Sequence, residues 1–157
     1  MIEYSSYTCP FCAFYHSSIY PKLEKDYINT GKIAYIIREF VAGKQDLYGG
    51  VLARCGGEKK FDTFVKILFA QQGKWTFNRN YEDILINIGQ IGGIMPHEFS
   101  TCLKDEKILN TLINNTREIN ARSEFIGTPT FFINQKKIPF FNKYSDLVEI
   151  IEQELKS

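Results

Sequence analysis

Two cysteines near the start of the chain, Cys9 and Cys12, enclose a Pro-Phe dipeptide in the stretch TCPFC. Two thiols at this spacing suit a redox-active dithiol, half of a zinc site, or a pair of small apolar residues in a core. The other two cysteines, Cys55 and Cys102, do not repeat the spacing, whereas a four-cysteine zinc site usually has two such pairs. We therefore favour the redox dithiol and keep the zinc site and the core pair as alternatives.

The residues around the two cysteines predict that Cys9 stands at the beginning of a helix. Pro10 suits the first helical position, because the N–H that proline lacks would have no partner there. The free N–H groups and the positive end of the helix dipole would then favour the thiolate form of Cys9. A stabilised thiolate stabilises the reduced protein and makes the disulfide a stronger oxidant. We expect Cys9 to be exposed and to react first, and Cys12 to be covered and to resolve the mixed disulfide.

The first 40 residues contain the elements that must position this dithiol. Residues 2–6 have the pattern of a short strand, and residues 10–29 that of a helix kinked at Pro21. The segment KIAYIIREF, residues 32–40, is rich in β-branched and aromatic residues and predicts a buried strand.

The character of the chain changes after residue 41. Residues 42–116 have mostly helical apolar spacing, interrupted by glycines. The stretch TPTFFIN then predicts a strand, QKK a tight turn, KIPFF a partner strand, and SDLVEIIEQELK a closing amphipathic helix. Strands at both ends with a helical block between them predict an α/β sheet domain that carries an insertion.

The whole chain has 157 residues, with 19 basic and 18 acidic side chains. This balance predicts no strong field for nucleic acid or for an anionic membrane. No apolar run approaches the roughly 18 residues that span a bilayer. Met1 leads directly into the first strand-like segment, so we recognise no secretory signal.

A second motif, IGTPTFF, places Thr128 and Pro129 immediately before a predicted strand. Most X-Pro peptide bonds are trans, so an ordinary turn is one interpretation. A cis bond beside the dithiol would instead let residue 128 offer its N–H and C=O groups to an extended peptide. The presence of the Cys-Pro-Phe-Cys motif makes us prefer the cis bond.

Together these motifs resemble the DsbA family of thioredoxin-fold thiol-disulfide oxidoreductases. The resemblance is carried by EYSSYTCPFCAFYH, REF and GTPTFFIN, while LARC, LFAQQGKW and STCLKD resemble the alphaproteobacterial branch. It implies a thioredoxin fold with an inserted all-helical domain, in which residues 1–41 and 117–157 form the thioredoxin-like part and residues 42–116 the insertion. It also implies a periplasmic protein that oxidises reduced exported proteins, is re-oxidised by a membrane partner of the DsbB kind, and needs no cofactor besides its own disulfide.

The resemblance also implies roles for single residues. Cys9 matches the nucleophilic cysteine of the family and Cys12 the buried one. Thr128 and Pro129 match the cis-proline loop. Glu3 matches a buried acid that assists proton transfer beneath the disulfide.

The chain departs from the family pattern at three places. Phe11 stands where the best-known members have histidine, so one stabiliser of the Cys9 thiolate is missing. Phe11, together with Thr128 before the proline, favours an isomerase or reductase as the alternative function, and a non-catalytic binding or zinc-scaffold module remains the alternative of a different class. The last hairpin, NQKKIPFF, lacks the glycines common there. The family's first strand does not precede Met1, so we expect the segment KIAYII to be an open sheet edge. We expect the chain either to self-associate through this edge or to be less stable than a form extended upstream.

The two remaining cysteines, Cys55 and Cys102, both fall in the helical insertion, which in the resembled branch can hold a second disulfide. We expect them to form a structural disulfide, with two separate buried thiols as the alternative. His16 is expected to be a packing residue rather than a base. Four aromatic residues are expected either to form an apolar patch for clients or to lie under the insertion: Tyr7, Phe11, Phe140 and Phe141.

Overall fold

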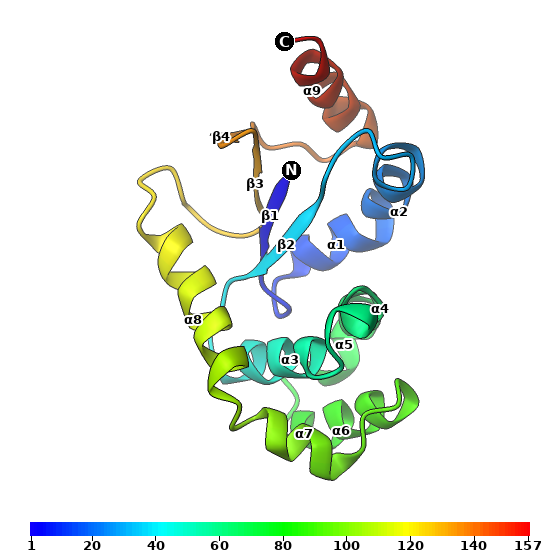
Figure 1. Ribbon diagram of the computed structural model, residues 1–157, viewed down its shortest axis with the longest axis vertical. Coiled ribbons are helices and arrows are strands. Elements are labelled where there is room, and N and C mark those ends of the chain that lie inside the picture. The colour runs from blue at the N-terminus through cyan, green and yellow to red at the C-terminus, as the bar shows by residue number, and fades with distance from the viewer.

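The computed structural model describes residues 1–157, which fold around a four-stranded mixed sheet (Figure 1). The strand order is β2-β1-β3-β4, where β2 is parallel to β1 and the other neighbours are antiparallel. The strands are β1 (Ile2–Ser5), β2 (Ile36–Glu39), β3 (Thr130–Ile133) and β4 (Lys136–Lys137). The central strand β1 therefore delivers the chain to the Cys9 motif from the middle of the sheet.

Alternate residues of β1 point to opposite faces of the sheet. Tyr4 packs with Phe132 and Ile119 on one face. Glu3 lies on the other face, where it contacts His16 of the first helix. The two faces of β1 therefore differ. One packs in a hydrophobic core, and the other places the buried Glu3 against the first helix.

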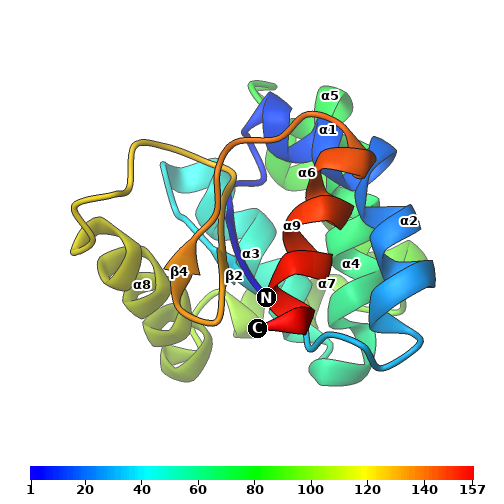
Figure 2. The ribbon, with the colours of Figure 1, turned by 90° about the horizontal axis from the view of Figure 1, so that it is seen from above.

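The first predicted helix is divided into three pieces: α1 (Pro10–Ser18), α2 (Tyr20–Leu23) and a π-helix (Glu24–Ile28). The break at Ile19 comes just before Pro21, which cannot donate to the preceding turn. The closing helix α9 (Tyr144–Lys156) packs against α1, α2 and β3 in one hydrophobic cluster. Figure 2 shows α1, α2 and α9 on one side of the sheet and α8 on the other.

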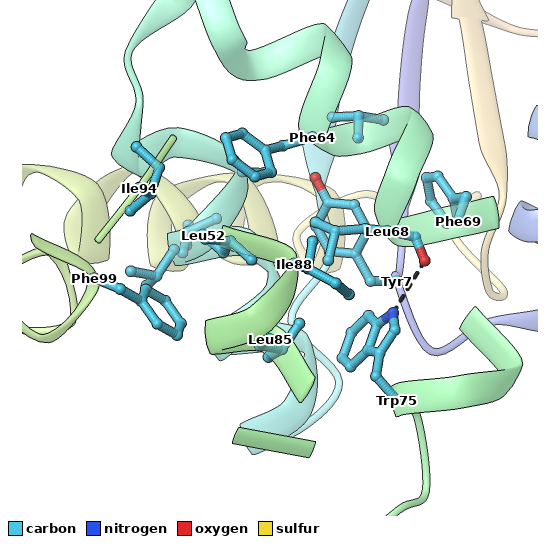
Figure 3. Packing of buried hydrophobic residues seen from close by; sticks show 14 of the residues in the cluster. Tyr7, Leu52, Phe64, Leu68, Phe69, Trp75, Leu85, Ile88, Ile94 and Phe99 are labelled. Atoms are coloured by element: carbon cyan, nitrogen blue, oxygen red, sulfur yellow. Dashed lines mark hydrogen bonds between the residues drawn. The ribbon is translucent and has the colours of Figure 1, made fainter. Parts of the chain in front are cut away.

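Six helices stand between β2 and β3. They are α3 (Lys44–Cys55), α4 (Glu58–Ala70), α5 (Gln72–Trp75), α6 (Tyr81–Ile91), α7 (Pro96–Cys102) and α8 (Glu106–Asn120). Their core gathers around Trp75, whose indole N–H donates to the Leu68 carbonyl oxygen over 3.0 Å (Figure 3). Gly49 permits this packing, because a Cβ there would lie 2.9 Å from the Trp75 ring.

The predicted α/β fold, a thioredoxin fold with a helical insertion, is confirmed. We retain as a proposal the division into residues 1–41 with 117–157 and residues 42–116. Helix α8 connects the two parts, since Ile119 near its end packs against Tyr4 of the sheet.

Three predictions about the strands were wrong in detail. The segment 32–40 is not a buried strand: β2 is shorter and lies at the sheet edge, with Ile36 46% exposed. The tight turn is formed by Asn134 and Gln135, both at positive φ as a two-residue hairpin turn requires, and not by QKK. KIPFF contributes no long partner strand, because Pro139 has no N–H to continue the pairing.

Candidate active site

Cys9 and Cys12 lie at the beginning of α1 as two free thiols. Cys9 is the N-cap residue with extended backbone (φ −82°, ψ 118°), and Pro10 begins the helix. Cys9 is partly exposed, whereas Cys12, one turn into the helix, is fully buried. The thiol of Cys9 also reaches the Thr128 carbonyl oxygen over 3.3 Å.

The two thiols differ strongly in acidity. Hydrogen bonding from the Cys12 thiol lowers the pKa of Cys9 to about 6, helped by Thr128 and by the backbone N–H groups of Phe11 and Cys12. Burial raises the pKa of Cys12 well above its usual range, and the neighbouring Cys9 raises it further. At neutral pH the reduced site therefore holds one thiolate, on the exposed sulfur, and one buried thiol.

The peptide bond between Thr128 and Pro129 is cis, and these two residues line a groove of about 700 Å³ beside Cys9. Phe11 and Phe140 also line the groove and are 65% and 79% exposed. Of the four aromatic residues considered as a client-binding patch, these two are open to solvent, while Tyr7 and Phe141 are buried in the hydrophobic clusters.

Glu3 is fully buried on the face of β1 toward α1. One of its oxygens lies 2.9 Å from His16 Nε2, and the other accepts a hydrogen bond of 2.7 Å from the Tyr35 hydroxyl. Burial acts to raise the pKa of Glu3, but the charge and hydrogen bond of His16, together with Ser5 and Tyr35, outweigh it and lower the pKa.

His16 does more than pack. Its ring stacks on Phe69 with centroids 4.2 Å apart, as a packing residue would, but its Nε2 atom is also the partner of the Glu3 carboxylate. A carboxylate only accepts hydrogen bonds, so Nε2 is the protonated nitrogen of the ring. The sequence offered one signal for this pair: His16 follows Cys12 by four residues and therefore shares its helix face.

Two residues of the insertion that the sequence interpretation missed hold the loop before Cys9. The buried Asp46 carboxylate accepts hydrogen bonds from the Ser6 hydroxyl, the Thr8 N–H and hydroxyl, and the Ala42 N–H, at 2.8 to 3.1 Å. These donors leave the loop between β1 and α1 little freedom, because both its side chains and its backbone are bound.

The second residue is Gln72, the first residue of α5. Its side-chain N–H group donates to the Tyr7 carbonyl oxygen over 2.7 Å and to the Cys9 carbonyl oxygen over 2.8 Å. The Tyr7 ring meanwhile enters the core of the insertion beside Phe69 and Trp75 (Figure 3). The inserted helices thus hold the dithiol loop through Asp46 of α3 and Gln72 of α5.

Cys55 and Cys102 form a disulfide that joins the last residue of α3 to the last residue of α7. Their Cα atoms are 5.6 Å apart, within the usual range for a bridged pair. The structure contains no group of three or more His, Cys, Asp or Glu side chains placed to hold a metal ion. None of the helices combines the length and the apolar character that crossing a membrane requires.

Comparison with known proteins identifies the family of this chain. The family model described as thioredoxin matches residues 1–153. A Rickettsia bellii protein provisionally named a protein-disulfide oxidoreductase is 51% identical over 135 residues, which are 85% of this chain and 52% of that protein. The chain thus spans about half the length of the Rickettsia relatives it matches. Disulfide bond formation protein D of Bacillus subtilis is 27% identical, covering 99% of this chain and 72% of that protein.

Solved structures of related proteins have the same fold as this chain. The structure of Wolbachia pipientis alpha-DsbA1 superposes with a TM-score of 0.87 at 24% identity, covering 99% of this chain and 84% of that one. Oxidised BdbD of Bacillus subtilis superposes with a TM-score of 0.85 at 25% identity, covering 99% and 86%. The fold is thus similar to that of alpha-DsbA1, and the chain belongs to the thioredoxin family.

Proposed function

We propose that this protein is a thiol-disulfide oxidoreductase, and specifically a dithiol oxidase that donates its Cys9–Cys12 disulfide to exported proteins. The observation that carries the proposal is the contrast between the two thiols. A partly exposed sulfur with a pKa of about 6 is a good leaving group, and a buried thiol one helical turn away is placed to close the disulfide again.

The chemistry follows from this contrast. A thiolate of the client attacks Cys9 Sγ, the Cys9–Cys12 bond breaks, and Cys12 leaves with the electron pair and takes up a proton. A second client thiolate then attacks the client sulfur of the mixed disulfide and releases Cys9 as a stabilised thiolate. The client has lost two electrons and gained a disulfide, and the protein is left as the dithiol seen in the structure.

Unfolded or reduced exported proteins fit the site as clients. The groove beside Cys9 is lined by exposed aromatic side chains and by the Thr128–Pro129 backbone, which suits an extended apolar peptide. We also propose a periplasmic location and re-oxidation by a membrane partner of the DsbB kind, with no cofactor besides the disulfide. The relatives named protein-disulfide oxidoreductase and disulfide bond formation protein D support the disulfide chemistry of this proposal.

The alternative is an isomerase or reductase on the same scaffold, and Phe11 favours it. The Phe11 side chain has no hydrogen-bond donor for the Cys9 thiolate. The thiolate is therefore stabilised by Cys12, Thr128 and the backbone N–H groups alone. A weaker thiolate would make the disulfide less oxidising.

Equilibration of the Cys9–Cys12 pair in glutathione buffers decides between the two. A reduction potential near about −120 mV is that of a dithiol oxidase, one near about −180 mV that of an isomerase, and one near about −270 mV that of a reductase. Cys9→Ser should abolish both peptide oxidation and insulin reduction, and activity retained in that variant would remove Cys9 from the mechanism.

We further propose that copies of the protein associate through the edge strand β2, whose Ile36 is 46% exposed. An edge strand presents unpaired N–H and C=O groups to another chain. Sedimentation of the native chain beside Ile36→Lys tests this: a concentration-dependent dimer that the substitution removes is expected, and a native monomer at high concentration would contradict it.

A further inference from the structure

Phe77, in the loop between α5 and α6, has two unusual features. Its backbone has a φ of 58°, in the left-handed region that bulky side chains rarely adopt. Its side chain is 80% exposed and packs in none of the hydrophobic clusters, whereas Trp75 two residues earlier is fully buried. Strain and exposure both cost free energy, and no packing contact offsets them. Backbone strain of this kind gathers at functional sites, where the surrounding structure maintains it.

The surrounding residues hold the Phe77 backbone in this conformation. The Gln45 side chain accepts a hydrogen bond from the Phe77 N–H over 2.8 Å and donates to the Asn78 carbonyl oxygen over 3.3 Å. The Thr76 N–H and hydroxyl both donate to the Gln72 carbonyl oxygen, over 3.0 and 2.7 Å. The backbone on both sides of Phe77 is therefore fixed, and the ring is held in solvent.

The loop that carries Phe77 lies on the insertion side of Cys9. Gln72, five residues before Phe77, donates to the Cys9 carbonyl oxygen over 2.8 Å, and α5 lies beside the beginning of α1 (Figure 2). The Cys9 sulfur contacts the Thr128 carbonyl oxygen, in the groove, over 3.3 Å. Cys9 therefore stands between the groove and the Phe77 loop. None of the groove-lining residues comes from the insertion, so Phe77 is a separate apolar contact point.

We propose that Phe77 is a second docking point for the client polypeptide, across Cys9 from the groove. The proposal rests on the proposed oxidoreductase function and deepens it, because it names the part of the client that this surface binds. The occupant is an extended, unfolded segment of the client that places an apolar side chain against the Phe77 ring. A folded client does not fit, since most of its large apolar side chains are buried.

The charges around Phe77 restrict the client further. Lys74 and Arg79 flank the ring in the chain, are exposed and take part in no ion pair. Glu82, the next acidic residue along the chain, is paired with Lys44. A client segment with an acidic residue beside its apolar one should therefore react faster than one with a basic residue there, by a margin that falls as salt is added.

The test is the second-order rate constant for oxidation of reduced two-cysteine peptides in which one phenylalanine is moved along an otherwise polar sequence. One helical turn, about 5.4 Å, separates Gln72 from Thr76, and an extended peptide advances about 3.3 Å per residue. The favoured position of the phenylalanine should therefore lie within about five residues of the client cysteine. At that position it should react about tenfold faster than alanine, the factor expected from covering one aromatic side chain.

Three substitutions tie this preference to the Phe77 ring. Phe77→Ala should remove the preference, and Phe77→Tyr should keep it. Phe77→Asn should remove it as well and melt no lower than the native protein, because asparagine tolerates the left-handed backbone. Ile91→Ala is the matched control, since it removes a side chain that is 81% exposed at the far end of α6, and it should leave the preference unchanged.

Exchange with reduced glutathione separates docking from the chemistry of the dithiol. Glutathione has one residue on either side of its cysteine, so its rate with the disulfide form should be native in Phe77→Ala. A peptide preference that Phe77→Ala keeps, or glutathione exchange slowed as much as peptide oxidation, would overturn the proposal. A change of oligomeric state in Phe77→Ala would assign the ring to contact between copies and overturn it too. Activity that survives Cys9→Ser would instead overturn the oxidoreductase function itself.

Discussion

Replacing Cys12 by alanine should raise the pKa of Cys9, because hydrogen bonding from the Cys12 thiol is the largest cause of its low value. The substitution removes the S–H donor but keeps the backbone N–H groups of Phe11 and residue 12, which also favour the thiolate. Cys12→Ser is the matched control, since its hydroxyl replaces one donor by another of similar size.

The size of the effect follows from the exposure of Cys9. A hydrogen bond to a charged group contributes about 1.5–3 kcal/mol. Cys9 is only partly buried, so solvent screening reduces this to about 1.4 kcal/mol, which is about one pKa unit. The pKa of Cys9 should therefore rise from about 6 to about one unit higher in Cys12→Ala and stay near its native value in Cys12→Ser.

The ultraviolet absorbance of the Cys9 thiolate, titrated against pH, measures this pKa directly. An unchanged midpoint in Cys12→Ala would show that the helix terminus alone lowers the pKa. A midpoint at the free-cysteine value of about 8.5 would show that the backbone donors contribute nothing. Either result would contradict the inference that the Cys12 thiol and the backbone N–H groups both lower the pKa of Cys9.

The same depressed pKa predicts how the stability of the reduced protein depends on pH. The folded-state pKa of Cys9 lies below the unfolded value of about 8.5, so the thiolate stabilises the reduced fold fully above that pH. This stabilisation is lost as pH falls through about 6. The melting temperature of the reduced form should therefore rise relative to the disulfide form between pH 5 and pH 8.5, and a constant difference would contradict the low pKa.

Three further predictions concern other parts of the molecule. Replacing Cys55 and Cys102 by alanine opens a loop with a sequence separation of 47, which the chain-entropy model values at about 4 kcal/mol, so the melting temperature should fall by about 8–16 °C. Phe11→His should add a donor beside the Cys9 thiolate and make the disulfide more oxidising, by about 30 mV for each ~1.4 kcal/mol in glutathione equilibration; an unchanged potential would show that the helix terminus sets it. Gln72→Met removes both hydrogen bonds to the active-site loop at constant length, and should cost about 2 kcal/mol in denaturant unfolding, whereas Gln71→Met on the preceding residue should cost little.

The sequence by itself determined the local part of the site. Cys9, Pro10 and Cys12 are close in the chain, and the beginning of a helix depends on the conformational preferences of neighbouring residues. The same holds for the helical character of the insertion, which is visible in the spacing of apolar residues. These features can be predicted without knowing which residues pack against them.

Only the tertiary structure decided which distant groups meet. Asp46 and Gln72 reach the dithiol loop from 38 and 63 positions away along the chain, and nothing in their local sequence distinguishes them from surface residues of a helix. His16 could be placed on the face of Cys12 from its spacing, but its contact with Glu3 depends on how α1 packs on the sheet. Side-chain partners across elements are set by packing geometry, which local patterns do not encode.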